Sequence, residues 1–221
     1  MTRLHARAFA LTLLLPVCVL GACDNSQASS QEPATNAVRI AQNAASRPAA
    51  KEQVLNEPDK ISLEMADRAC KAEDFKAFFD VFIVSKSVRQ KYSASQIRYA
   101  VLGPHGEKIS ERTFDAASYS SFPVKMLDYY YKPVKPARAG DEDEYLDLQF
   151  NQSQNNDVSV EWSRVHYDGQ SDGGDDLGNP LDANGKPIPK GAHQDPEGQL
   201  LFHPAADCWE LSEDIRWARK K

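Results

Sequence analysis

The hydrophobic pattern of the chain changes once, at about Ser95, and this change limits the fold more than any other feature. Before it, apolar side chains recur with the helical period of about 3.6 residues, and after it they alternate as in a strand. The first part predicts helices at residues 61–71, 75–84 and 87–92. The second of these helices carries an apolar stripe that consists of Phe75, Phe78, Phe79, Phe82 and Ile83. We expect this stripe to pack under a sheet, with a groove for a ligand or partner as the alternative.

Alternation predicts short antiparallel strands in the rest of the chain. The turn Gly103-Pro104-His105-Gly106 separates the first two strands, and the polar turn at residues 155–157 closes the best-defined hairpin. In that hairpin one face is apolar and the other polar, which is typical of an antiparallel sheet covered on one side. The expected strands are 97–101, 108–110, 125–132, 146–150, 158–163, 199–203 and 209–211.

Helices followed by strands predict an α+β domain, with N-terminal helices packed on one face of a curved antiparallel sheet. We expect this single domain at residues 59–221. Residues 23–58 are rich in Ala, Gln, Ser and Asn and have almost no aromatic side chains, which indicates a flexible tether. A long acidic loop is expected at residues 168–198, and loops of this length are usually functional or disordered.

The N-terminus has the three parts of an export signal. The basic residues Arg3 and Arg7 precede an apolar run at residues 11–20, which is too short to span a bilayer, and small residues follow it. The motif Leu20-Gly21-Ala22-Cys23 resembles the lipobox of bacterial lipoproteins. This resemblance implies a signal peptide at residues 1–22 and acyl chains on Cys23, while an ordinary cleaved signal is the alternative.

The same resemblance implies an address in the cell envelope. Asp24 follows the lipidated cysteine, as in lipoproteins of enteric-type bacteria that are retained in the inner membrane. We therefore expect a protein that faces the periplasm from the inner membrane, with the outer membrane as the alternative. Its first partner is the membrane itself, through the lipid anchor.

Two cysteines remain in the processed chain, because Cys18 lies in the signal and Cys23 carries the lipid. The compartment beyond the inner membrane is oxidising, so Cys70 and Cys208 are expected to form one disulfide bond. Two separately buried thiols are the alternative. A redox-active pair is not expected, because the Cys-x-x-Cys spacing is missing.

The helical segment at residues 75–92, together with the closing Cys208-Trp209-Glu210-Leu211, resembles the cone-shaped NTF2-like fold over about residues 60–217. The resemblance implies a concave sheet that holds a pocket, and the family has no single activity to transfer. Phe79, Tyr99 and Trp162 are the residues that we expect to line such a pocket.

Motifs of the familiar enzymes are missing from the sequence. His166 and His203 could meet across the sheet, but two imidazoles without an orienting carboxylate are a weak basis for zinc or acid–base chemistry. The acidic loop offers calcium ligands, although its spacing does not match the EF-hand pattern, and a solvated loop is the default interpretation. These candidate ligands are Asp168, Asp172, Asp175 and Asp176. No cofactor is expected.

The net charge of −6 includes Arg3 and Arg7, so the processed chain carries −8 and is not expected to bind nucleic acid. The sequence favours a lipid-anchored periplasmic binding protein without catalytic activity, which holds a small or lipidic ligand or supports an envelope assembly. One alternative is an immunity-type inhibitor that neutralises a periplasm-acting antibacterial effector. The other is an unusual hydrolase, which would need His166, His203 and an acid to converge.

Overall fold

The computed structural model describes residues 55–170, 177–182, 184–206 and 208–218. The predicted signal, the lipobox and most of the tether therefore lie outside the described residues. No described helix is both long and apolar enough to cross a membrane. The elements are α1 (Glu57–Lys71), α2 (Phe75–Val84), α3 (Lys86–Lys91), β1 (Ser93–Leu102), β2 (Lys108–Asp115), β3 (Val124–Leu127), β4 (Tyr130–Pro133), β5 (Tyr145–Gln152), β6 (Val158–Tyr167), β7 (Pro180–Leu181), β8 (Gly198–Ala205) and β9 (Cys208–Trp217).

The first helix begins earlier than the hydrophobic pattern predicts. Asn56 caps α1 by accepting a hydrogen bond of 2.8 Å from the backbone N–H of Asp59. Pro58 lies in the first turn, where its missing N–H has no intrahelical acceptor and its fixed φ suits a helix. The expected end of the tether at residue 58 thus falls inside α1. The second helix has the predicted bounds, and Asp74 caps it through Ala77.

The main sheet has the strand order β2-β1-β9-β8-β6-β5, and the two-residue strand β7 pairs with β6. Its strands are antiparallel with one exception: β1 pairs with β9 in parallel, with Tyr99 opposite Asp214. The alternating pattern predicts an antiparallel sheet throughout. This parallel pair joins strands that are far apart in the sequence, so local alternation could not reveal it.

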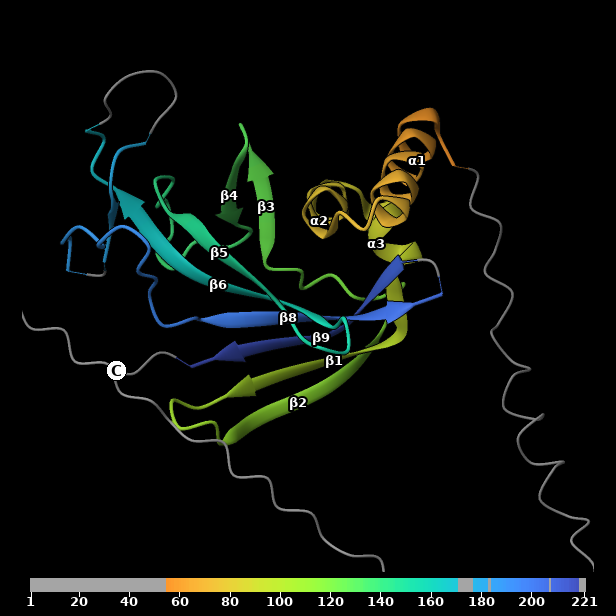
Figure 1. Cartoon of the computed structure of the whole chain (residues 1–221). Coiled ribbons are helices and arrows are strands. Elements are labelled where there is room, and N and C mark those ends of the chain that lie inside the picture. The colour runs from red at the N-terminus through yellow and green to blue at the C-terminus, as the bar shows by residue number, and fades with distance from the viewer. Residues whose placement is uncertain (1–54, 171–176, 183, 207, 219–221) are drawn as a thin grey trace, which may run out of the picture. The chain divides into compact units, whose positions relative to one another are not determined.

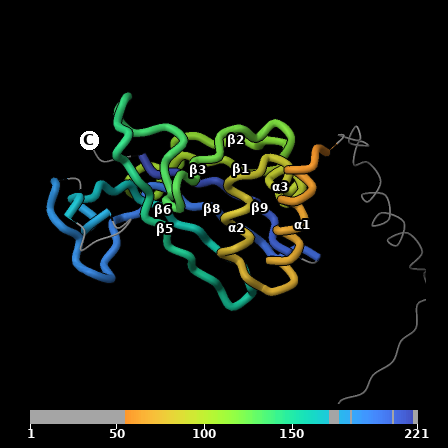
Figure 2. Tube along the Cα trace, turned by 90° about the horizontal axis from the view of Figure 1, so that it is seen from above, coloured from red at the N-terminus to blue at the C-terminus, as the bar shows by residue number. Residues whose placement is uncertain are grey.

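The helices lie on one face of the curved sheet, as Figure 1 shows, and the view from above places α1 and α2 over the strands (Figure 2). The predicted α+β class is therefore confirmed. The phenylalanine stripe of α2 packs into the sheet: Phe82 lies 5.2 Å from Phe202 and Phe79 lies 5.5 Å from Phe150, measured between ring centroids. Phe78, Phe79 and Phe82 are fully buried. The stripe is core, not a ligand groove.

Residues 125–132 form a hairpin and not the single strand that the sequence analysis expected. β3 and β4 are joined by Asp128 and Tyr129, whose φ angles of 47° and 70° are both left-handed, as in a type I′ turn. Glycine and asparagine usually occupy these positions, so no turn signal is visible between β3 and β4 in the sequence. The hairpin is held to α2, because Tyr131 Oη donates a hydrogen bond of 2.6 Å to Asp80.

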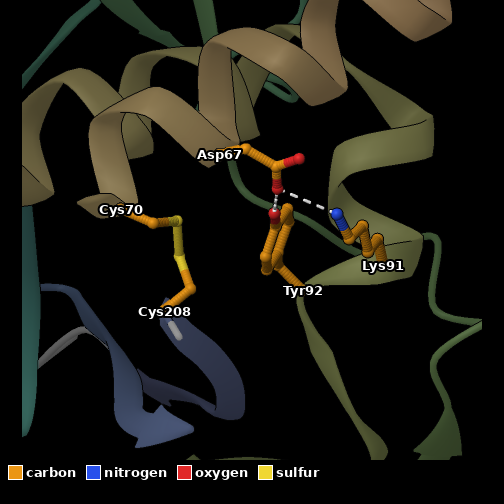
Figure 3. Close-up of a disulfide and its surroundings, with 5 residues drawn as sticks. All are labelled: Asp67, Cys70, Lys91, Tyr92 and Cys208. Atoms are coloured by element: carbon orange, nitrogen blue, oxygen red, sulfur yellow. Dashed lines mark hydrogen bonds and ion pairs between the residues drawn. A yellow bond between two sulfur atoms is a disulfide. The ribbon is translucent and has the colours of Figure 1, made fainter. Parts of the chain in front are cut away.

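One disulfide joins the helical layer to the sheet (Figure 3). It connects Cys70 in the last turn of α1 with Cys208 at the start of β9, and the two Cα atoms lie 4.9 Å apart. Nearby, Asp67 accepts hydrogen bonds from Tyr92 Oη and from Lys91 Nζ, the latter at 2.9 Å. The bond from Tyr92, followed by that from Lys91, lowers the pKa of Asp67. The end of α1 is thus fixed to the body by a covalent bond and a polar cluster.

Candidate functional site

The structure does not bring together the three residues that the sequence analysis assigned to a pocket. Phe79 and Trp162 belong to the buried hydrophobic core. Tyr99 packs elsewhere on the sheet, with its ring 5.9 Å from that of Phe114 and 5.2 Å from the guanidinium of Arg216. The apolar half of the concave face is therefore filled by the protein's own side chains.

A cleft of about 820 Å³, lined by several charged side chains together with apolar surface, lies at the end of the sheet where β6 and β9 finish and β8 begins. The connection from β4 to β5, the turn after β1 and the segment after β7 complete its walls. Most of its charged side chains are acidic, and none of the described residues that line it carries a hydroxyl or a thiol. Its carboxylates belong to Asp141, Glu144, Asp182, Asp195 and Glu197.

Arg164 organises the inner part of this cleft. Its Nε lies 3.2 Å from Glu144 Oε2, and its Nη1 donates to Glu197. The N–H of this Nε does not point at an acceptor among the described residues, so its contact with Glu144 is an ion pair without a hydrogen bond. Glu144 is buried and also accepts a hydrogen bond of 2.8 Å from the backbone N–H of Ala137. The guanidinium lies 5.3 Å from the Trp162 ring. These contacts hold the β4–β5 connection and residue 197 against β6.

The alternation of β6 places Arg164 in the cleft. Val158, Val160 and Trp162 are buried on one face of the strand, and Arg164 is the next residue on that face. The register sets Leu146 opposite Arg164 on β5, which brings nearby Glu144 within reach. An arginine that continues an apolar alternation was the one sequence signal that could have found this site.

Two charged residues of the cleft are exposed and have no partner within the part of the chain that the structure describes. Arg138 and Asp195 both line the cleft, and neither side chain has a hydrogen bond or an ion pair with the residues that the structure describes. The cleft therefore has an inner part fixed by ion pairs and two charged groups of opposite sign at its exposed edge. This arrangement can bind a small charged molecule without rearranging its inner part.

His166 and His203 do not meet. His166 lies near the end of β6, whereas His203 lies on β8 beside Phe202, which pairs with Val158 at the start of β6. Each has its own carboxylate instead. His166 Nε2 lies 3.1 Å from Asp141 Oδ2 in the cleft, and His203 Nδ1 lies 2.8 Å from Asp157 Oδ1. Neither carboxylate is predictable from the sequence as a partner of these histidines.

The acidic loop shows no cation site in the part that the structure describes. Asp168 Oδ1 accepts hydrogen bonds of 2.9 Å from the backbone N–H groups of Gln170 and Asn179, so this carboxylate closes the base of the loop. The bond from the Asn179 side chain is the largest cause of its lowered pKa. Asp172, Asp175 and Asp176 lie outside the described residues. Over the described part of the chain, His, Cys, Asp and Glu do not group into a set that could hold a metal ion.

A second polar cluster lies on the covered face of the sheet. Asp214 is fully buried, and it accepts a hydrogen bond of 2.7 Å from Tyr119 Oη and bonds of 3.1 and 2.8 Å from Arg216. Burial, followed by the Asp214 charge, raises the pKa of Tyr119 well above its ordinary value of 10.0. These bonds fix the segment between β2 and β3 to β9. Because Tyr119 and Asp214 lie 95 residues apart, no local pattern could predict the cluster.

No family model and no curated protein matches the chain. Among solved structures, the chain is similar to a protein of Novosphingobium aromaticivorans DSM 12444 that is named as the beta subunit of an aromatic-ring-hydroxylating dioxygenase. The two share 7% sequence identity over 84% of this chain and 93% of that chain, with a TM-score of 0.25. A likeness at this level carries no argument about function.

Proposed function

We propose that the protein is a lipid-anchored binding protein of the cell envelope, that its cleft holds a small charged ligand, and that it performs no covalent chemistry on this ligand. The anchor is the one implied at Cys23. The observation that carries the proposal is the cleft, in which Arg164 fixes the inner part while Arg138 and Asp195 at the exposed edge have no partner among the described residues.

The filled core supports a polar ligand over a lipidic one. Phe79 and Trp162, which were expected to face a ligand, instead pack in the core. The cleft offers charged and hydrogen-bonding groups together with the half-buried Trp217 ring. Sites that fix a small polar molecule combine such groups in this way.

Binding without chemistry is supported by the cleft lining, in which the described residues include no hydroxyl or thiol nucleophile. The pair of His166 and Asp141 has the arrangement of a general base held by a carboxylate, and it is the feature that a hydrolase would use. Recovery of a chemically altered ligand with the unsubstituted protein, but not with His166→Gln, would replace the binding proposal with a hydrolase.

The test is purification of the full-length acylated protein from the envelope of its bacterial host, followed by native mass spectrometry. We expect a small molecule bound to the unsubstituted protein and most of it lost from the Arg138→Gln/Asp195→Asn variant. Asp143→Asn is the control, because its exposed carboxylate lies outside the cleft, and it should retain the full amount of bound ligand. Equal occupancy in all three proteins would overturn the cleft assignment. A stoichiometric effector protein in place of a small molecule would favour the immunity-type inhibitor.

The anchor is tested separately. Labelling of growing cells with radioactive palmitate should mark the unsubstituted protein and leave Cys23→Ser unlabelled. An unlabelled parent protein would remove the anchor from the proposal and leave the cleft experiment unaffected.

A further inference from the structure

We propose that the tip of the β3–β4 hairpin, Leu127, Asp128 and Tyr129, contacts the headgroups of an anionic lipid bilayer and thereby orients the domain on the membrane. This inference rests on the proposed lipid anchor, which keeps the domain near a bilayer. It adds a second contact that sets which side of the domain faces the lipid.

The tip displays a large side chain in an unfavourable backbone conformation. Tyr129 is 94% exposed and Leu127 is 51% exposed. Tyr129 has a left-handed φ of 70°, at a turn position that glycine usually occupies. The hairpin beneath is rigid, because Val124 is buried and Tyr131 is bonded to α2. Strained residues on a fixed support are concentrated at functional sites, so the tip is expected to contact something.

Most of the exposed large apolar residues belong to the elements on the helical side of the sheet. Over the described residues, the large apolar side chains that are exposed number seven, and six of them lie on α1, on α2 or in and just after the hairpin. The seventh, Ile109, lies on the edge strand β2. Figure 1 shows the helices and the hairpin above the sheet and β2 at its lower edge. The six are Ile61, Met65, Val84, Leu127, Tyr129 and Val134.

The charge of the hairpin segment complements an anionic surface. Residues 122–138 contain four Lys or Arg side chains and one Asp, although the processed chain as a whole carries −8. The helical layer at residues 57–92 is neutral, with seven basic and seven acidic side chains. Lys125 and Lys135 are exposed on or beside the hairpin. Basic side chains near a bilayer are attracted to anionic lipids, and tyrosine is enriched at the level of the headgroups.

The attachment point of the tether lies on this side as well. The first turn of α1, which the chain from Cys23 enters at Glu57, and the hairpin tip both lie at the top of the domain in Figure 1. A domain that is tethered there can lower the hairpin tip to the bilayer without turning over. This shared side favours a lipid surface over a protein partner.

The test is co-sedimentation of the processed chain, residues 23–221 with Cys23→Ser, with vesicles of equal parts phosphatidylglycerol and phosphatidylcholine. We expect binding that weakens with added salt and in vesicles of phosphatidylcholine alone. The Leu127→Ser/Tyr129→Ser variant should bind about tenfold more weakly, because it loses the inserted apolar area. Ile109→Ser removes a similarly exposed apolar side chain from β2 and should bind like the parent. Circular dichroism and the melting temperature verify that each variant is folded.

Equal binding by the parent and the hairpin variant, or no vesicle binding by the parent, would overturn the inference. Capture of a protein partner that depends on the tip, without vesicle binding, would also overturn it and assign the tip to protein docking. The assay uses neither the acyl chain nor the cleft ligand. A failure of the proposed function therefore leaves its result unchanged.

Discussion

Removal of the disulfide is the sharpest test of how the helical layer is held to the sheet. The Cys70→Ser/Cys208→Ser variant breaks the covalent link between the last turn of α1 and the start of β9. The buried Ala66 and Ala69 still pack α1 against the body, and Asp67 keeps its bonds to α3 and its C-cap. We therefore expect the variant to fold to the same structure with a lower free energy of unfolding.

The size of the loss follows from the length of the closed loop. The bonded residues lie 138 positions apart, and in the chain-entropy model such a loop stabilises by about 5 kcal/mol, less any strain and residual structure in the unfolded chain. A domain of this kind has a total stability of about 5–15 kcal/mol. The variant should thus lose a third or more of its stability and unfold at a clearly lower urea concentration.

The assay is urea unfolding of the oxidised parent, the reduced parent and the double variant. The reduced parent and the variant should coincide, and both should show a steeper dependence on urea, because an unfolded chain without the crosslink exposes more surface. A loss below about 1 kcal/mol would refute the loop-closure argument. So would a reduced parent that is as stable as the oxidised one.

Three further substitutions test other contacts. Asp67→Asn should lower the free energy of unfolding at neutral pH, because the folded-state pKa of this carboxylate is lowered. The stabilisation by the ionised carboxylate is present above the ordinary pKa of 3.8 and is lost as the pH falls through the folded-state pKa. The difference in urea midpoint between parent and variant should therefore be smaller below pH 3.8 than at pH 7. Gly198→Ala would place a Cβ in the space of the Trp162 ring and should lower the free energy of unfolding by about 1–3 kcal/mol, measured by thermal melting. Gly103→Ala meets only the end of the flexible Glu107 side chain and should be nearly neutral in the same measurement. Tyr129→Gly should raise stability by about 0.5–1 kcal/mol, because glycine accepts the left-handed turn; a loss of stability would show that Tyr129 makes compensating contacts.

Helices and most strands were predictable because their signals are local. The α2 stripe and the alternation of β5 and β6 each lie within one element, and both predictions agree with the structure. The β3–β4 hairpin was missed because left-handed Asp128 and Tyr129 replace the usual glycine signal. The parallel contact of β1 with β9 was missed because it joins distant segments.

The cleft was out of reach for a different reason. Its inner part combines Glu144, Arg164 and Glu197 from three separate segments, and only the register of β5, β6 and β8 brings them together. Each residue alone is an ordinary surface charge in the sequence. Only the position of Arg164 in the alternation of β6 departs from that pattern.

Gly198 lies where the covered face of β6 and β8 passes from apolar side chains to the ionic side chains of the cleft. It lies opposite Trp162 on β6 and opposite Arg216 on β9, and the Trp162 indole occupies the space that a side chain at position 198 would need. Away from the cleft, these two strands are apolar and buried, with Val160 opposite Leu200. Toward the cleft, Arg164 can stay beneath the surface only with acidic partners, because a buried charge without one is strongly unfavourable. Its ion pairs with Glu144 and Glu197 therefore stabilise the inner part of the cleft, and a ligand can bind there without first ordering the site.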